Sequence, residues 1–116
     1  MLELTTQELF EERFFWKEGA RPSGVRSTDG AFLVYFTASW CGPCKALNVD
    51  TIDQMASTYN LPCWKCDYVV NDYTAGYCTI RSFPTFAIIV PKKIVKVIQS
   101  NQTQLVCDWI QDCHEK

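Results

Sequence analysis

No apolar run in the sequence approaches the ~20 residues that a membrane-spanning helix requires, so no transmembrane segment is expected. The first residues, Met1 to Leu4, have neither the basic flank nor the apolar stretch of a signal peptide. The formal net charge of −2 offers no broad basic surface for nucleic acid or for an anionic membrane. These absences argue against nucleic-acid and membrane partners and make the cytoplasm the expected compartment.

Cysteine, by contrast, is abundant, with seven residues in a chain of 116. An odd number is awkward for a secreted protein whose cysteines are all paired, whereas cysteines in a reducing compartment can simply be small hydrophobic residues. The composition, 47% hydrophobic and 21% charged, suits one globular domain over residues 1–116. The cysteines therefore leave the cytoplasmic expectation in place, and their spacing becomes the main question.

The stretch from Phe36 to Lys45 contains two cysteines, Cys41 and Cys44, with Gly42 and Pro43 between them. An apolar run before this stretch predicts a buried strand, and the residues after it predict a helix. The free N–H groups and the dipole at the start of a helix favour a thiolate over a thiol. Gly42 lets the chain turn, and Pro43 suits the first helical turn. The spacing is short enough for the two sulfurs to bond to each other, which predicts a redox site.

Two other interpretations of a C-x-x-C motif compete with this one. The pair could be half of a zinc site, or it could be two inert cysteines in the core. Trp40 stands directly before the motif, and Gly42 and Pro43 fill its middle. These three residues favour the redox interpretation over both alternatives, so no metal is expected.

The order of the predicted elements is that of an α/β fold. A helix separates the strand before the dithiol from the next strand, so these two strands are expected to run parallel. The last two strands are close enough in sequence to pair antiparallel as a hairpin. The predicted strands are 1–4, 31–37, 61–68, 86–90 and 94–98. Helices are predicted near 5–14, 43–59 and 71–78 and after Asn101, and the last helix has one apolar face formed by Leu105, Val106, Trp109, Ile110 and Cys113. A connection is predicted over 17–30 and a turn at 91–93.

The run from Trp40 to Cys44, Trp-Cys-Gly-Pro-Cys, reproduces the active-site motif of thioredoxins letter for letter. A C-x-x-C motif beside a βαβ pattern is a general sign of such proteins, and the longer stretch from Phe36 to Lys45 resembles eukaryotic-type cytosolic thioredoxins in particular. The resemblance covers roughly residues 31–110. It implies the thioredoxin fold, an α/β fold with a central mixed β-sheet flanked by helices on both faces. It also implies an enzyme that requires no metal and no organic cofactor.

The resemblance assigns roles to individual residues. Cys41 would be the nucleophile at the exposed end of the turn, and Cys44 would resolve the mixed disulfide. Trp40 would shield the site and offer an apolar contact surface to the substrate. Pro84 corresponds to a cis proline that faces the dithiol in thioredoxins, which implies a cis Phe83–Pro84 bond and Phe83 backbone groups that pair with the substrate main chain.

One of the departures from the family pattern bears on the chemistry. Thioredoxins usually bury an Asp six residues before the first active cysteine, where it helps to take the proton of the buried thiol, and here that place holds Tyr35. The Lys usually found nearby corresponds to Lys65, and Asp67 faces the same side of the same predicted strand. A phenol with a reference pKa of about 10 is a poor base near neutral pH. Resolution is therefore expected to be slow unless Asp67 or a water near Lys65 takes the proton; alternatively, Tyr35 simply packs in the core.

Five further cysteines have no assigned role. On a strand, residues three apart point to opposite faces, so Cys63 and Cys66 cannot converge on one metal or readily bond to each other. Both are expected to be small core residues. Cys78 and Cys107 are expected to be exposed and regulatory, and Cys107 and Cys113 lie on different faces of the predicted last helix, so they form no zinc site.

Three functional hypotheses follow from these features. The first is a cytoplasmic, monomeric enzyme that reduces protein disulfides and is recharged by a thioredoxin reductase-type electron donor. The second is a disulfide oxidase or isomerase, against which the Gly42-Pro43 pair argues, because oxidising members of the family usually carry a His there. The third is a thioredoxin-fold binding subunit of a larger assembly, in which the redox site is incidental. A reduction potential near about −270 mV would indicate a reductant, and about −120 to −180 mV an oxidant.

Overall fold

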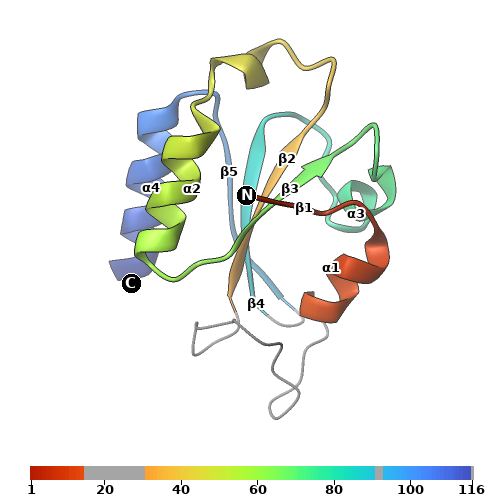
Figure 1. The fold of residues 1–116 in the computed structure, drawn as a ribbon, viewed down its shortest axis with the longest axis horizontal. Helices are drawn as coiled ribbons and strands as arrows, with labels where there is room; N and C mark the ends of the chain where they lie inside the picture. The colour runs from red at the N-terminus through yellow and green to blue at the C-terminus, as the bar shows by residue number, and fades with distance from the viewer. Residues whose placement is uncertain (15–30, 91–92, 116) are drawn as a thin grey trace.

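The computed structural model describes residues 1–14, 31–90 and 93–115 (Figure 1). The predicted connection over 17–30 and residues 91–92 of the predicted turn lie outside the described residues. The described parts of the chain form one sheet with helices against it, and the dithiol lies at one end of that sheet.

Five strands form one mixed sheet with the order β1-β3-β2-β4-β5. They are β1 (Leu2–Glu3), β2 (Phe32–Thr37), β3 (Cys63–Asp67), β4 (Thr85–Val90) and β5 (Lys93–Gln99). β3 runs parallel to both β1 and β2, whereas β4 runs antiparallel to both β2 and β5. The central strand β2 is buried along its whole length, which explains why its sequence is a nearly continuous apolar run and not an alternating one. The predicted parallel pair and the predicted antiparallel hairpin are both confirmed.

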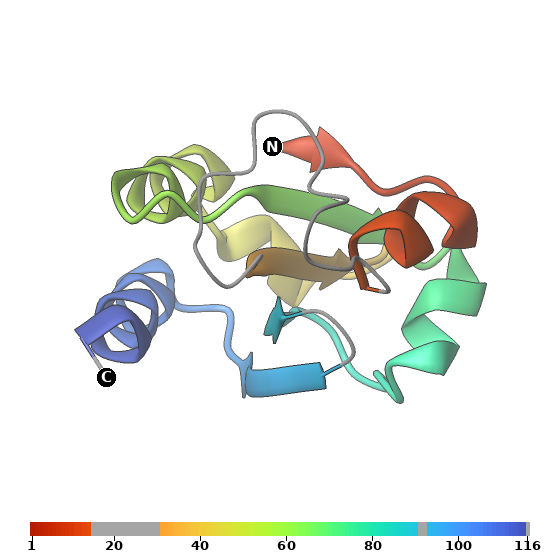
Figure 2. The same cartoon turned by 90° about the horizontal axis from the view of Figure 1, so that it is seen from below.

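Helices cover both faces of the sheet. α1 (Gln7–Phe14) and α3 (Asp72–Tyr77) lie on one face, and α2 (Val49–Thr58) and α4 (Thr103–Glu115) lie on the other (Figure 2). Each face has its own apolar core: Phe10, Phe32, Phe36 and Trp64 pack on the α1/α3 side, and Leu33, Ile52, Phe86, Val106 and Ile110 pack on the α2/α4 side. The predicted fold, a mixed sheet with helices on both faces, is confirmed.

The helix after the dithiol is shorter than the sequence pattern predicts. A four-residue 3-10 helix, η1 (Pro43–Ala46), follows the cysteines, and Leu47 then adopts an extended conformation. α2 begins only after Asn48, whose side chain accepts a hydrogen bond from the Thr51 N–H at 3.2 Å. The Asn48 N–H donates to the Thr103 hydroxyl at 2.9 Å, which ties this break to the start of α4. A polar cap and a contact from a distant part of the chain therefore interrupt the predicted continuous helix.

Leu105, predicted on the apolar face of the last helix, is not buried with Val106 and Ile110 of that face. Val106 and Ile110 are fully buried as expected, but the Leu105 side chain is about half exposed. No described helix is both long and apolar enough to cross a membrane.

Candidate active site

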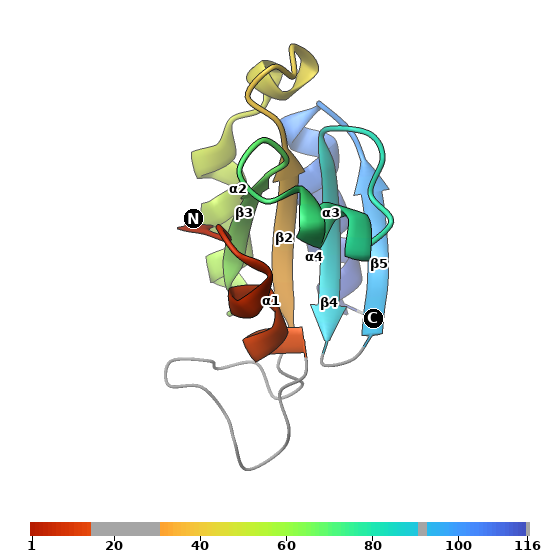
Figure 3. The ribbon, with the colours of Figure 1, turned by 90° about the vertical axis from the view of Figure 1, so that its right-hand side faces the viewer.

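The dithiol lies where β2 ends, above the edge formed by the carboxyl ends of β2 and β3 (Figure 3). Cys41 and Cys44 form a disulfide, and their Cα atoms are 5.4 Å apart. The β3–α3 connection and the connection from α3 to β4 lie at the same end of the sheet (Figure 3). Within the described residues, no group of three or more His, Cys, Asp or Glu side chains could hold a metal ion. The arrangement is that of two cysteines placed close enough to form a disulfide with each other.

Backbone groups of the turn hold the Cys41 sulfur in place. The Cys44 N–H donates to the Cys41 Sγ at 3.2 Å, and the Cys41 N–H donates to the Ala38 carbonyl at 2.9 Å. When the pair is reduced, an N–H in this place favours the thiolate of Cys41, because a hydrogen bond to the charged form lowers the pKa of a thiol. η1 has only four residues, so the helix start beside the cysteines is a single short turn.

The two residues between the cysteines fit the turn in different ways. Pro43 begins η1, where its missing N–H has no helical partner, as predicted. Gly42 has φ −62° and ψ −51°, a helical conformation that any residue can adopt, so the turn does not depend on the conformational freedom of a glycine. A Cβ at Gly42 would meet no atom within 4 Å. Gly42 thus leaves the surface beside the sulfurs free of a side chain.

The two active cysteines are almost equally buried. Cys41 is 4% exposed and Cys44 is 7% exposed, so the prediction that Cys41 is the more exposed of the two is wrong for the disulfide form. The reason is packing: Ala38 and the half-buried Phe83 form one apolar cluster with both cysteines. Trp40 is 66% exposed, and its ring packs edge-on against Phe83 of this cluster.

Phe83 and Pro84 face the same cluster. The Phe83–Pro84 peptide bond is cis, as the resemblance implies. Pro84 directly precedes β4, and Phe83 packs against the disulfide cluster. Among the described residues, no group is hydrogen-bonded to the Phe83 backbone. This backbone is therefore available to pair with an extended chain that lies across the sulfurs.

Tyr35 lies in the core below this end of the sheet. Its side chain is 3% exposed, its ring stacks on Phe86 with centroids 4.8 Å apart, and its hydroxyl donates to the Thr37 Oγ1 at 3.1 Å. Burial raises the pKa of Tyr35 above its usual value; the hydrogen bond to Thr37 opposes this rise in part, and the charge of Asp67 adds to it. Tyr35 is therefore protonated near neutral pH and cannot serve as a base there.

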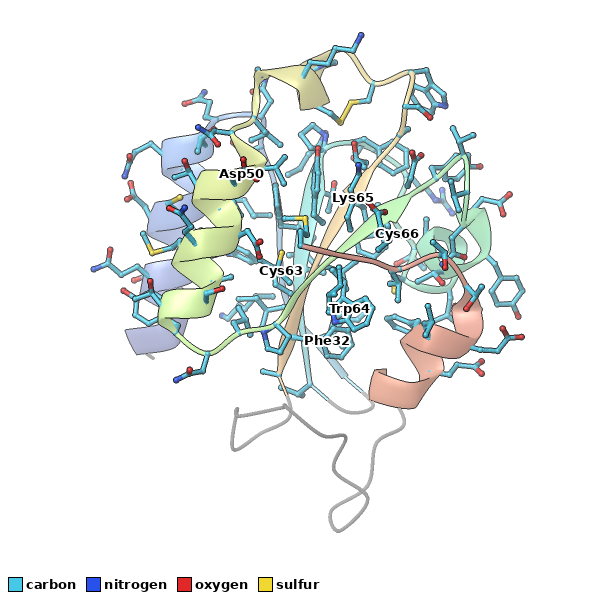
Figure 4. All side chains as sticks on the ribbon, viewed as in Figure 1. Phe32, Asp50, Cys63, Trp64, Lys65 and Cys66 are labelled. Carbon is cyan, nitrogen blue, oxygen red and sulfur yellow. A yellow bond between two sulfur atoms is a disulfide. The ribbon has the colours of Figure 1, made fainter. Side chains whose placement is uncertain are left out.

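Lys65 and Asp67 share the β3 face that Tyr35 borders. Tyr35 and Lys65 are partners in the parallel β2–β3 register, and Figure 4 shows Lys65 nearer the dithiol end of the sheet than Phe32. The Lys65 ammonium lies 3.9 Å from the Glu3 carboxylate, a contact on the sheet edge that sequence patterns did not reveal. The Asp67 carboxylate accepts hydrogen bonds from the Ser39 hydroxyl and the Val69 N–H. The structure thus brings Tyr35, Lys65 and Asp67 together on neighbouring strands.

The other cysteines are separate from the dithiol. Cys63 packs on the α2/α4 side and Cys66 on the α1/α3 side of β3, so they point apart as predicted (Figure 4). Burial raises the pKa of Cys63, Cys66 and Cys78 to about 12 in each case. Cys78 and Cys107 are 3% and 4% exposed, so the prediction that they are exposed is wrong. Both belong to the packed cores between the helices and the sheet, which makes them inert thiols.

Sequence patterns did not identify an aromatic cluster next to the dithiol. The rings of Trp40 and Tyr68 have centroids 6.5 Å apart, and the Phe83 ring lies 5.7 Å from Trp40 and 5.5 Å from Tyr68. Tyr68 comes from the β3–α3 connection, where the sequence continues with two valines, Val69 and Val70. The available signal was this apolar triplet at a position where a turn usually carries polar residues.

Comparison with known proteins gives a consistent picture. The thioredoxin family model matches residues 18–112. The chain is 41% identical over 73 residues to a thioredoxin of Chlorobaculum thiosulfatiphilum, covering 61% of this chain and 67% of that protein. It is 32% identical over 79 residues to an H-type thioredoxin of Ricinus communis, covering 67% of each. The fold matches a crystal structure of thioredoxin from Trypanosoma brucei brucei with a TM-score of 0.77 at 20% identity, covering 100% of this chain and 92% of that one.

Proposed function

The chain belongs to the thioredoxin family of thiol–disulfide oxidoreductases, and we propose that within this family it is a reductant of protein disulfides that uses Cys41 and Cys44. In this proposal the protein is a cytoplasmic monomer without a metal or organic cofactor, and a thioredoxin reductase-type electron donor recharges it. The observation that carries the proposal is the Cys41–Cys44 disulfide at the end of β2, with the Cys44 N–H directed at the Cys41 sulfur.

The reaction takes place in two exchanges. The Cys41 thiolate attacks one sulfur of the substrate disulfide, so that a mixed disulfide forms and the other substrate sulfur leaves as a thiolate. The Cys44 thiol then loses its proton and attacks the Cys41 sulfur. This attack closes the Cys41–Cys44 disulfide and releases the second substrate sulfur. Two electrons pass to the substrate, two protons complete its thiols, and the electron donor reopens the disulfide of the enzyme.

Other residues near the dithiol support these two exchange reactions. The exposed Trp40 ring supplies an apolar surface beside the sulfurs, and the unpaired backbone of Phe83, next to Pro84, can hold the substrate main chain. Gly42 places no side chain beside the sulfurs, and Pro43 begins η1 next to them. Lys65 and Asp67 are the charged groups that can assist the proton transfer, because the neighbouring Tyr35 is protonated near neutral pH.

The proposal is tested by insulin reduction with a thioredoxin reductase as the electron donor. The wild-type chain is expected to reduce insulin, and Cys41→Ser is expected to abolish the reaction. Cys44→Ser should accumulate stable mixed disulfides with protein substrates, whereas Cys41→Ser should trap none, because only Cys41 attacks the substrate. Cys113→Ser, a partly exposed cysteine on α4, is the matched control and should behave as the wild type. Trapping by Cys41→Ser but not by Cys44→Ser would reverse the assignment of the two cysteines.

A further inference from the structure

The turn between β3 and α3 carries apolar side chains in solvent. Val69 and Val70 are each 60% exposed, and Tyr73, in the first turn of α3, is 67% exposed. Gly, Pro, Asn, Asp and Ser are the residues that stabilise tight turns, and valine does not. The exposed valines also contribute nothing to the core. Neither turn geometry nor folding therefore accounts for this apolar surface.

The backbone holds the valines outward. The Val69 N–H donates to the Asp67 carboxylate at 3.0 Å, and the Val70 N–H donates to the Asp67 carbonyl at 2.9 Å. The next residue, Asn71, is buried; its side-chain amide donates to the Leu4 carbonyl at 3.1 Å, and its side-chain oxygen accepts from the Thr74 N–H. The turn is thus fixed at both ends, and the valines are presented on a preorganised support.

This surface is continuous with the reacting sulfurs. Tyr68, 40% exposed, joins the valines to the Trp40 and Phe83 rings, whose centroids lie 6.5 and 5.5 Å from its own. Phe83 in turn packs against the disulfide cluster. Figure 3 shows the β3–α3 connection at the same end of the sheet as η1. The apolar surface beside the disulfide therefore continues over Tyr68 to its chain neighbours Val69 and Val70, and the exposed Tyr73 follows in the first turn of α3.

We propose that this strip, formed by Tyr68, Val69, Val70 and Tyr73, binds an aliphatic or aromatic segment of the substrate polypeptide next to the disulfide that is being reduced. The proposal rests on the proposed function and names its substrate class: disulfides flanked by apolar residues. Through Tyr68 the strip adjoins Trp40 and Phe83, and Phe83 packs against the disulfide cluster. A reacting polypeptide arrives with its disulfide and leaves after the exchange, so it is the occupant that this position allows.

The test compares substrates that differ only beside the disulfide. Two disulfide-bridged peptides carry either Leu and Phe or Ser and Gln next to the cystine, and 5,5′-dithiobis(2-nitrobenzoate) serves as a small disulfide without flanking residues. The double variant Val69→Asn/Val70→Asn should lose about tenfold in kcat/KM for the apolar peptide, through KM, as removal of a few apolar contacts does. Its kcat/KM for the polar peptide and for the small disulfide should stay within about twofold of the wild type.

A matched control variant and a binding measurement complete the experiment. Leu105→Gln removes a similarly exposed apolar side chain on α4, across the sheet, and should leave all three substrates unaffected. Binding of the linear, cysteine-free apolar peptide to the oxidised protein, followed by fluorescence anisotropy, should weaken by a similar factor in the double variant.

The outcomes separate the two proposals. If the double variant lost kcat/KM equally for the apolar and polar peptides, or for neither, the proposed role of the strip would be wrong, whereas the reductase function would be unaffected. If the wild type reduced no disulfide but still bound the apolar peptide in a manner dependent on Val69 and Val70, the reductase function would fail and the strip would stand. A dimer of the wild type that the double variant abolishes would assign the strip to a second copy of the chain and overturn the proposal.

Discussion

Tyr35→Asp restores the carboxylate that thioredoxins usually bury near the dithiol. In the wild type the phenol is protonated near neutral pH, because burial raises the pKa of Tyr35 above 10. It therefore cannot accept the proton of Cys44 when the mixed disulfide is resolved. If no other group takes that proton efficiently, a carboxylate at position 35 should accelerate the resolving step, for which general bases typically contribute about 10²–10⁴-fold. We expect at least the lower end of that range.

The same substitution has a predictable effect on stability. The Tyr35 ring is 3% exposed and stacks on Phe86, so its loss resembles the removal of a core aromatic side chain, which costs about 3–5 kcal/mol. A buried carboxylate adds a desolvation penalty, because charge is disfavoured away from water. Against a total stability of about 5–15 kcal/mol for a typical domain, the variant should fold but with a clearly lower free energy of unfolding.

Tyr35→Asn is the matched control for this experiment. It has nearly the shape of Asp and leaves the same cavity, but it carries no base. The assay follows the second thiolate released from 5,5′-dithiobis(2-nitrobenzoate) by the reduced protein, since the first release reports the Cys41 attack and the second reports resolution by Cys44. Stopped-flow traces between about pH 6 and 8 span the range in which a buried Asp with a raised pKa ionises. The second phase should be faster in Tyr35→Asp than in Tyr35→Asn and should accelerate as pH rises.

Equal second-phase rates in Tyr35→Asp, Tyr35→Asn and the wild type would refute the reasoning. Such a result would mean that Asp67, or a water near Lys65, already takes the proton, and that Tyr35 serves only to pack the core. The conservative variant Tyr35→Phe separates the hydroxyl from the ring. It loses only the hydrogen bond to Thr37, so it should leave the second phase unchanged and reduce stability by about 1 kcal/mol.

Two further predictions concern stability. The pKa of Cys63 and of Cys66 is raised from 9.0 to about 12. Between these pH values the folded state retains protons that the unfolded state releases. The free energy of unfolding should therefore fall as pH rises from about 9 to about 12, by at most about 1.4 kcal/mol per pH unit for each thiol. Urea unfolding across this range should show a smaller slope for Cys63→Ala than for the wild type, and equal slopes would contradict the assignment. Asn71→Ala should lower the free energy of unfolding by about 1–3 kcal/mol, because it removes the α3 cap and leaves the Leu4 carbonyl without its buried donor. Asn48→Ala, the exposed cap of α2, should lose only about 1 kcal/mol, and equal losses would mean that burial at Asn71 adds nothing.

The features that could be predicted from the sequence depend on local patterns. The apolar run of β2, the C-x-x-C spacing and Pro43 at the first position of η1 were readable because neighbouring residues determine each of them. The same holds for the opposite orientation of Cys63 and Cys66, which follows from the alternation of side chains along a strand.

The features that the sequence did not reveal depend on contacts between distant segments. The break between η1 and α2 is held by a hydrogen bond from Asn48 to Thr103, 55 residues further along the chain. Cys78 and Cys107 are buried because helices and the sheet pack around them. Cys41 is buried because it packs against Phe83, which lies between α3 and β4. No periodicity within one segment carries such information.

The reduction potential of the Cys41–Cys44 couple tests the central claim most directly. The protein is equilibrated near neutral pH with dithiothreitol or glutathione buffers of graded composition, and the state of the two cysteines is read after alkylation, in a Cys113→Ser background that removes the partly exposed thiol of α4. A reductant of protein disulfides should give a potential near about −270 mV. A value of about −120 to −180 mV would show that the protein oxidises or isomerises disulfides, and it would contradict the proposed function.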